Sequence, residues 1–424
     1  MTPPCVVLIG FGKILLTRLD ELLPAGSVVV VEDPDVIRKR SVEQEVGRLA
    51  CVGALLPAAY HQSLECVDAA VSHLGDRAVE AVLPGLEYGV RAAAALAARL
   101  GLPGATPAAA ACLTDKLRLR EAAAAGGLRS PEWTEVFGPG DVRRFARGRP
   151  VVLKPANRHA SLGVQRLAAG DDVDAAWDAT VQARDDVMLP DRALRWRYLA
   201  ERRLDGREYS AEALVARGEL LFLNVTEKLT AAGRHPVELG HVVPAGLPGA
   251  VQARFERAMG ALTRAVGFRD GILHAEWMLD ADGPVLIECA GRIPGDSIVD
   301  LIEAAYGCDL VGALVAVLSG RRPALPRRAK AATAIRFLTA APGRVCAVDG
   351  VERARATPGV MRAAVTVAAG DEVAELRSSW DRVGEVIAVG RTPAEAQARA
   401  GAAVAAVRVR TSASAGAVMD GRAA

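Results

Sequence analysis

The sequence predicts an open parallel α/β domain at the N-terminus, followed by α+β regions. Over residues 5–112, short Val/Leu/Ile runs alternate with helical stretches rich in Ala, Arg, Leu and Glu, which is typical of a parallel sheet. From residue 148 onward, apolar runs separated by turn residues indicate β-hairpins. A chain of 424 residues is also too long for one hydrophobic core, so several domains are expected.

The first segment, residues 6–36, is close to the dinucleotide-binding fingerprint. An apolar strand runs into Gly10 and Gly12, and a second strand ends on the acidic pair at 32–33. The third glycine of that fingerprint is replaced by Leu15, whose side chain blocks the close helix–strand packing that the motif needs. We therefore expect a nucleotide-fold-like domain without NAD, in which the two glycines let their loop approach a central cleft.

The remaining elements follow in order from periodicity and turn residues. They are a Gly/Pro-rich connection, a helix, two β-rich hairpin segments, a helix, a third hairpin, a helix and a last α+β region, at residues 101–110, 111–130, 148–167, 199–228, 250–266, 271–290, 296–306 and 331–410. We place the domains at 1–112, 113–325 (with a lid subdomain at about 128–203) and 326–410, and expect 411–424 to be disordered.

Composition limits the kinds of partner. The net charge of +2 predicts no bulk attraction to nucleic acid or to an anionic membrane. No apolar run is long enough to span a bilayer, and the N-terminus lacks the features of a signal peptide. The seven cysteines contain no C-x-x-C pair, so neither zinc nor a disulfide framework is indicated. These features favour a cytoplasmic protein.

The third hairpin is the most informative segment. If its turn centres near residues 281–283, Glu276 lies opposite Glu288, and the period of two puts His274 and Arg292 on the same face. Opposed carboxylates, with carbons about 4.5–5.5 Å apart, repel and call for a cation. Mg²⁺ suits such a site because it takes one or two carboxylates and completes its shell with phosphate and water. An exposed polar face is an equally good interpretation of this segment alone, and a slip of one residue would separate the pair.

The opposite face of the hairpin is expected to face the core. Its side chains are uniformly apolar and occupy every second position. They are Leu273, Ala275, Trp277, Leu279, Val285, Ile287 and Cys289.

Four segments resemble motifs of the ATP-grasp superfamily, and within it of the carboxylate–amine ligases that include the bacterial L-amino-acid ligases. They are TDKLRLREAAAAGGLRSPEW (114–133), VVLKPANRHASLGV (151–164), AERRLDGREYSAEALV (200–215) and HAEW…LIECAGRIPGD (274–296). Their order and spacing agree with the family over about residues 110–300. The resemblance implies an ATP-grasp fold between an N-terminal α/β domain and a small C-terminal α+β domain, an architecture like that of biotin carboxylase.

The resemblance also implies a nucleotide site. Its residues would be Lys116, Lys154, Ser161, Glu201, Leu204 and Glu208, of which the lysines and the serine would contact phosphates and the others adenine and ribose. The loop at 157–163, which would cover the phosphates, departs from the family because it reads Asn-Arg-His-Ala-Ser-Leu-Gly instead of being rich in glycine. We expect Arg158 and His159 to replace the missing glycines as side-chain contacts to phosphate.

For metal and catalysis, the resemblance implies that Glu276 and Glu288 bind Mg²⁺ and that Arg292 stabilises an acyl phosphate, helped by backbone N–H groups near Gly295. Many family members have an asparagine, touching a second metal, at the position of Ala290; alanine there also occurs in the amino-acid ligase branch. Candidates for contact with the amino-acid carboxylate or amine are Lys228, His241 and His274; a structural role is at least as good an interpretation of each.

The activity implied is an ATP- and Mg²⁺-dependent ligase. It would join a small-molecule carboxylate, from an amino acid, to an amine through an acyl phosphate and release ADP and phosphate. The alternatives are a biotin-carboxylase-type enzyme, an NAD-dependent oxidoreductase and a non-catalytic ATP-binding protein. The sequence leaves open the two substrates, the pathway, the number of metal ions, whether Mn²⁺ can replace Mg²⁺, and whether the chain forms a homodimer.

Overall fold

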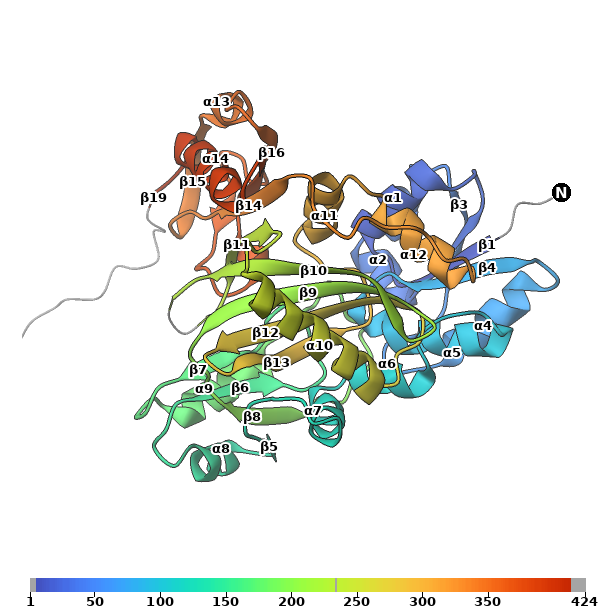
Figure 1. Ribbon diagram of the computed structural model, residues 1–424, viewed down its shortest axis with the longest axis horizontal. Coiled ribbons are helices and arrows are strands. Elements are labelled where there is room, and N and C mark those ends of the chain that lie inside the picture. The colour runs from blue at the N-terminus through green and yellow to red at the C-terminus, as the bar shows by residue number, and fades with distance from the viewer. Residues whose placement is uncertain (1–4, 233–234, 413–424) are drawn as a thin grey trace, which may run out of the picture. The chain divides into compact units, whose positions relative to one another are not determined.

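A computed structural model describes residues 5–232 and 235–412 (Figure 1). The chain divides into two compact units, which we describe separately. The first comprises Met1–Val225, Leu247–Val299 and Cys308–Arg328, and the second comprises Thr226–Gly246, Asp300–Gly307 and Ala329–Ala424. These units are defined by contacts and each gathers separate stretches of sequence, so the domain boundaries expected from the sequence remain a prediction.

The N-terminal part of the first unit is a four-stranded parallel sheet with the order β3-β2-β1-β4. Its elements are β1 (Cys5–Ile9), α1 (Lys13–Leu22), β2 (Val28–Glu32), α2 (Pro34–Lys39), α3 (Val42–Val46), β3 (Val52–Pro57), α4 (Glu65–Leu74), β4 (Val79–Pro84), η1 (Glu87–Gly89) and α5 (Val90–Leu100). Strands β1 and β2 are buried along their whole length, which explains their unbroken apolar runs. The loops after the four strands meet at the carboxyl edge, where ligands of open α/β sheets bind.

Two helices lead into a small antiparallel sheet with the order β5-β8-β6-β7. The elements are α6 (Pro107–Leu113), α7 (Lys116–Ala125), β5 (Trp133–Val136), α8 (Pro139–Ala146), β6 (Val151–Pro155), β7 (Gln165–Leu167), α9 (Val173–Gln182) and β8 (Tyr198–Arg202). The single helix expected over 111–130 was wrong, because the chain breaks at Asp115, whose carboxylate caps the second helix by accepting the N–H of Leu117.

The central sheet of the first unit carries the third hairpin. It contains β9 (Arg207–Ala216), β10 (Glu219–Thr230, which ends in the second unit), β12 (Gly271–Asp280) and β13 (Gly283–Ala290), in the order β13-β12-β9-β10. Helix α10 (Gly249–Ala265) crosses β9 and β12 in Figure 1 and packs its Phe255 ring against Tyr209 and Trp277. Helix α12 (Leu310–Leu318) also belongs to this unit, whereas α11 (Ile298–Tyr306) belongs to the second unit from Asp300 onward.

The second unit contains the order β11-β14-β18-β16 and a three-stranded sheet β17-β15-β19. The bounds are β11 (Glu238–Val243), β14 (Ala332–Leu338), β15 (Gly343–Asp349), α13 (Val351–Arg355), β16 (Val360–Val365), β17 (Glu372–Val373), η2 (Ser379–Asp381), β18 (Gly384–Gly390), α14 (Pro393–Ala406) and β19 (Arg408–Ser412). Because β19 reaches Ser412, the first two residues of the expected disordered tail are in a strand; residues 413–424 lie outside the described part of the chain.

In the described part of the chain, no single helix is both long enough and apolar enough to cross a membrane. Helices α11 and α12 pass that test only when they are taken together across the break between them.

Candidate active site

The third hairpin places Glu276 of β12 directly opposite Glu288 of β13, as the sequence predicted. The route to this register differs from the expected one. The turn is tighter, with Asp280 paired to Gly283, and a bulge at Ile287 restores the register. The bulge removes Ile287 from the pairing, leaves it half-buried, and places Val285 opposite Met278, on the face of Glu276. The assignment of Ile287 and Val285 to the face of Trp277 was therefore wrong, and the fully buried Leu286 takes the place opposite Trp277.

Each carboxylate of this pair has a cationic neighbour. Lys116 Nζ lies 3.0 Å from Glu288, and Nε2 of His274 lies 3.6 Å from Glu276. His274 Nδ1 also lies 3.0 Å from a carboxylate oxygen of Glu212. Burial disfavours the charged ring, but the hydrogen bonds to Glu212 and Glu276 raise the pKa of His274 to about 9. The imidazolium therefore balances the two acids beside it.

Glu212 is a buried acid that the sequence analysis missed. Strand β9 pairs with β12 so that His274 faces Glu212 and Glu276 faces Ser210. The Glu212 carboxylate accepts hydrogen bonds from Ser210 Oγ at 2.6 Å and from Asn224 Nδ2 at 2.8 Å. The sequence does contain a signal for this acid. Polar side chains occupy every second position of β9, so they share one face of the strand, and that face continues the polar face of the hairpin.

Lys154, expected to bind phosphate, belongs to a buried ionic cluster. Its Nζ lies 2.6 Å from Glu201, whose other oxygen accepts the Nε–H of Arg120 at 2.7 Å. Burial lowers the pKa of Lys154, and the charge of Glu201 opposes part of that fall. Burial favours a higher pKa for Glu201, but the charges of Arg120 and Lys154 outweigh it and hold the pKa below its usual value. Arg120 also donates to the carbonyl of Ile287 at 2.5 Å, so this cluster fixes the bulge that positions Glu288.

Replacing Arg120 with methionine is expected to lower the free energy of unfolding by about 3 kcal/mol, because it breaks one side of a fully buried ion pair. Lys154 would still neutralise Glu201, which limits the loss. Urea unfolding of the purified protein measures the effect. Arg118→Met, on the exposed side of the same helix, is the matched control and should change stability by less than about 0.5 kcal/mol. An equal effect of the two substitutions would contradict the role of the cluster.

The loop at 157–163 has an unusual backbone. Ala160 and Ser161 are left-handed, with φ of 58° and 56°, and Gly163 has φ of 76°. Left-handed backbone costs a residue with a Cβ about 1–2 kcal/mol, and a glycine almost nothing. The chain thus builds this loop without the glycines that its shape favours. Lys116 Nζ donates to the carbonyl of Arg158 at 2.8 Å, which ties the loop to the start of α7.

Arg158 and His159 are engaged by protein groups, contrary to their expected role as phosphate contacts. The Arg158 guanidinium lies 4.2 Å above the ring of Trp196 and donates to the carbonyl of Ala183. The His159 ring packs edge-on against Tyr88, 4.7 Å between centroids. Burial, with a smaller effect of nearby cations, lowers the pKa of His159 to about 3, so its ring is neutral and a poor anion ligand. Both side chains hold the loop in place.

Arg292 follows β13 and is held by two contacts. Its Nε donates to Glu87 at 2.8 Å, and its Nη1 donates to the carbonyl of Ile293 at 2.7 Å. Nη2 has no hydrogen-bond partner among the described residues and can serve a ligand. Glu87, which the sequence analysis missed, lies after β4; burial raises its pKa and Arg292 opposes that rise. Gly295 lies in the following loop, where its carbonyl accepts the N–H of Ile298.

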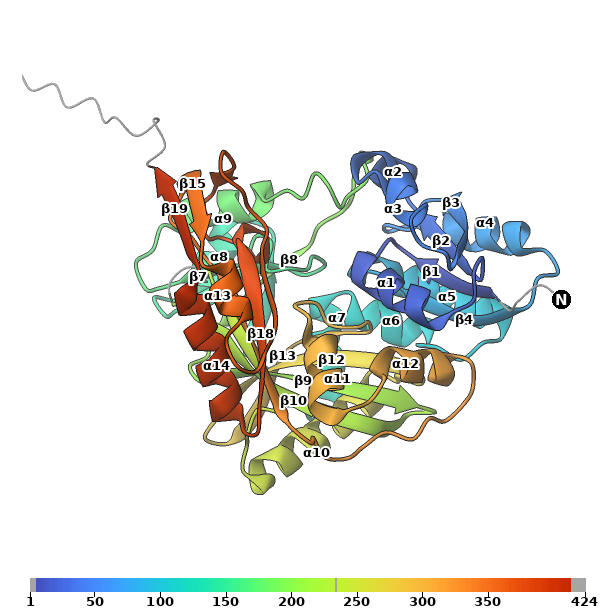
Figure 2. The ribbon, with the colours of Figure 1, turned by 90° about the horizontal axis from the view of Figure 1, so that it is seen from above.

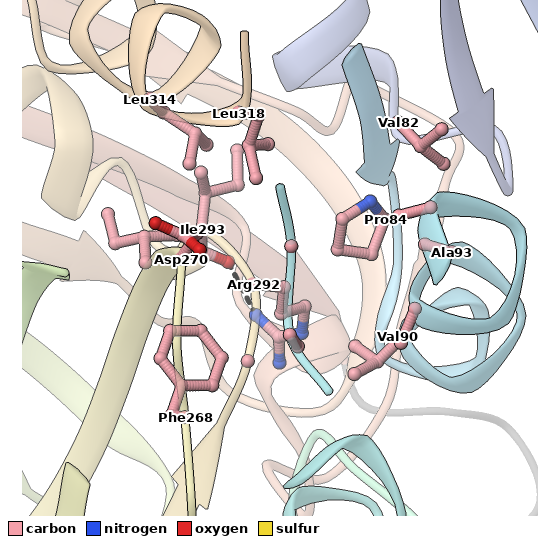
Figure 3. A pocket seen from close by; sticks show the side chains of 17 residues that line it. Val82, Pro84, Val90, Ala93, Phe268, Asp270, Arg292, Ile293, Leu314 and Leu318 are labelled. Carbon is pink, nitrogen blue, oxygen red and sulfur yellow. Dashed lines mark hydrogen bonds between the residues drawn. The ribbon is translucent and has the colours of Figure 1, made fainter. Parts of the chain in front are cut away.

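An apolar pocket lies beside Arg292 (Figure 3). Its walls come from β4, α5, α12 and the segment 268–272, and include Val82, Pro84, Val90, Phe268, Ile293 and Leu314. Arg292 and Asp270 are the charged residues of this lining. Because most of the lining is apolar, the charge of the Arg292 guanidinium is screened less here than in water.

The other expected site residues occupy separate places. Glu208 pairs with Arg166 of β7 at 2.5 Å, and Leu204 lies two residues beyond the end of β8. Lys228 and His241 are cross-strand partners in the second unit, where Lys228 lies 3.3 Å from Glu238. The roles expected for these residues in ribose, adenine and substrate binding, like that of Gly295, remain predictions.

The two acids at 32–33, which in a dinucleotide-binding protein would bind ribose, are bonded here to other groups of the chain. The Glu32 carboxylate accepts the backbone N–H of Phe11 at 2.7 Å. Asp33 binds Nδ1 of His61 at 2.6 Å and pairs with Arg192, and these contacts hold its pKa low despite burial. A Cβ at Gly12 would lie 2.2 Å from the carbonyl oxygen of Gly85, so this glycine is needed where two loops cross. The pair therefore fixes loops at the carboxyl edge of the sheet.

Comparison with known proteins identifies two domains. Residues 147–300 match the model of the ATP-grasp domain, and residues 336–412 match that of the L-amino acid ligase C-terminal domain 2. The uncharacterized protein y4rH of Sinorhizobium fredii (strain NBRC 101917 / NGR234) is 29% identical over 70% of this chain and 60% of its own length. An alanine–anticapsin ligase of Bacillus subtilis is 26% identical over 62% of this chain and 59% of its own.

Among solved structures, the L-amino acid ligase from Bacillus licheniformis superposes with a TM-score of 0.78 at 18% identity, covering 97% of this chain and 99% of that one. At this identity the likeness establishes the fold, and it confirms the expected fold class. The chain spans about three fifths of the length of the two curated relatives.

Proposed function

The chain contains an ATP-grasp domain and the C-terminal domain of L-amino acid ligases, and on this premise we propose that it is an ATP-dependent ligase. It joins the carboxylate of an amino acid to the amine of a second small molecule. The observation that supports this most strongly is the pairing of Glu276 with Glu288 across β12 and β13, with Lys116 beside it. ADP and phosphate are the by-products.

The donor set at the hairpin fits Mg²⁺. Glu276 and Glu288 offer carboxylate oxygens from neighbouring strands, and the ion prefers oxygen ligands together with phosphate and water. When bound, the ion neutralises charge on the nucleotide phosphates. Lys116 contacts both Glu288 and the loop at 157–163, so it joins the metal ligands to the phosphate cover. Lys154 presents a second, buried ammonium group to the nucleotide.

The reaction proceeds in two steps in this proposal. A carboxylate oxygen of the first substrate attacks the γ-phosphorus of ATP, and the bond to ADP breaks to give an acyl phosphate. The amine then attacks the acyl carbon, its C–N bond forms, and the C–O bond to phosphate breaks as the amine loses a proton. Arg292 donates from its free Nη2 to the oxygens that gain charge, while Glu87 holds the guanidinium in place.

The rival functions have less support. The L-amino acid ligase C-terminal domain favours amide synthesis over a biotin-dependent carboxylation. An NAD enzyme would need a free acid after β2, whereas Glu32 and Asp33 are bonded to the chain's own loops.

All seven cysteines are free thiols, which favours a reducing compartment such as the cytoplasm. A homodimer is part of the proposal and is open to measurement by light scattering.

A matrix of amino acids and amines, with phosphate release as the readout, tests this function. We expect release that needs ATP, Mg²⁺, an acid and an amine together, with the amide detected by mass spectrometry. Release stimulated by biotin and bicarbonate would instead establish the carboxylase, and nucleotide binding without phosphate release from any pair would establish a non-catalytic protein.

A further inference from the structure

The loop at 157–163 needs outside support to keep its shape. Ala160 and Ser161 hold left-handed backbone without the freedom of glycine. Within the loop, the N–H of Leu162 bonds to the carbonyl of His159 at 3.2 Å, and the N–H of Val164 bonds to that of Ser161 at 3.1 Å. Two long local hydrogen bonds do not hold a strained backbone by themselves, so the contacts made by its side chains decide its conformation.

One set of supports comes from a strap, which we define as residues 183–197. In Figure 2 it runs from the end of α9 to α2 and back to β8. Asn157 donates to the carbonyl of Arg195 at 2.9 Å and accepts the N–H of Arg197 at 3.2 Å. Arg158 stacks on Trp196. The strap therefore supports the first two residues of the loop, Asn157 and Arg158.

The strap is in turn fixed to the N-terminal sheet. Lys39 of α2 lies 2.5 Å from Asp191, and Arg192 pairs with Asp33 after β2. Gln62 makes two hydrogen bonds to the backbone of Arg195, at 2.8 and 2.9 Å. Because these partners lie at the carboxyl edge of the parallel sheet, the strap connects that edge to the loop.

Tyr88 is the direct contact between the N-terminal sheet and the centre of the loop. Its ring lies 4.7 Å from His159 and 4.9 Å from His61, whose other side is held by Asp33. Tyr88 is also the next residue after Glu87, the partner of Arg292. A single dipeptide therefore contacts both the catalytic arginine and the loop.

We propose that Tyr88 is a positioning residue that keeps the loop at 157–163 closed over the acyl phosphate and excludes water from it. This inference rests on the proposed ligase function. In the productive reaction the amine forms a C–N bond as the C–O bond to phosphate breaks. In the wasteful reaction, water forms a C–O bond at the same carbon, phosphate leaves, and the free acid returns with its proton released. Water and the amine compete for the same acyl carbon. A closed loop excludes water and thereby favours attack by the amine.

The first test is the ratio of ADP released to amide formed. Tyr88→Ala should raise this ratio several-fold, while Tyr88→Phe, which keeps the ring, should restore the wild-type ratio. Phe137→Ala is the matched control, since it removes an aromatic ring that is 80% exposed, in the turn between β5 and α8, and it should leave the ratio unchanged. An unchanged ratio in Tyr88→Ala, or the same rise in Phe137→Ala, would overturn the inference.

A second test needs no substrate and separates this inference from the ligase function. Hydrogen exchange at the amides of Leu162 and Val164 in the nucleotide-free protein should be faster in Tyr88→Ala and unchanged in Tyr88→Phe. Equal exchange in Tyr88→Ala and the wild type would refute the anchoring, whatever the turnover. If the wild type releases no ADP with any acid and amine, the ligase function fails, while the exchange rates still decide whether Tyr88 holds the loop.

Discussion

Replacing Glu276 or Glu288 with glutamine is expected to reduce ATP-dependent phosphate release at least about 100-fold. Loss of a partner that only orients a metal ligand costs about 10–100-fold, and loss of a ligand should cost more. Glutamine keeps the shape of the side chain but removes the negative charge that balances the cation. The measurement is the initial rate across a Mg²⁺ titration, with ADP binding followed in parallel by calorimetry.

The folded state should tolerate both changes. Glu288→Gln removes the carboxylate beside Lys116, but the ammonium group keeps its hydrogen bond to the carbonyl of Arg158. Removing either acid also relieves the repulsion between them. Asp282→Asn, in the turn of the same hairpin with an 86% exposed side chain, is the matched control and should turn over like the wild type. Wild-type Mg²⁺ dependence in the glutamine variants would refute the metal assignment.

The alternation of side chains along each strand of this hairpin was predictable, whereas its exact turn was not. The period of two fixes which side chains of one strand share a face, but the turn residues also fit the tighter turn that pairs Asp280 with Gly283. The bulge at Ile287 was not predictable, since it depends on Arg120, which comes from another element and donates to its carbonyl. The tighter turn shifts the register by one residue, and the bulge shifts it back. Glu276 therefore lies opposite Glu288 as predicted, although neither the tighter turn nor the bulge was expected.

The residues that sequence analysis missed have partners that are distant along the chain. Arg120 and Glu201 are 81 residues apart, and Glu87 and Arg292 are 205 residues apart. No periodicity within one element reports such pairs, because they exist only after the sheets are assembled. The same limit applies to Arg158 and His159, which suggest phosphate contacts by residue type but pack on Trp196 and Tyr88, two rings that are distant along the chain.

Replacing Arg292 with alanine is expected to spare nucleotide binding and to reduce the formation of acyl phosphate about 100–1,000-fold, the effect of removing one donor to a developing oxyanion. Its Nε and Nη1 are held by Glu87 and by the carbonyl of Ile293, so Nη2 is presented in a fixed direction. Arg292→Lys should recover only part of the activity, because one ammonium group cannot bond Glu87 and the substrate with the geometry of a planar fork. Trapping of the acyl phosphate with hydroxylamine measures the step.

Loss of folding does not explain the expected result for Arg292→Ala. Glu87 would lose its cation, but burial already raises its pKa and the loss of Arg292 would raise it further, which favours the neutral carboxyl over a buried unpaired charge. The variant should therefore bind ADP with the wild-type affinity and unfold at a similar urea concentration. Arg269→Ala, an exposed arginine in the segment before β12, is the matched control and should form hydroxamate at the wild-type rate. Wild-type trapping by Arg292→Ala would show that the charge of the acyl phosphate is stabilised elsewhere.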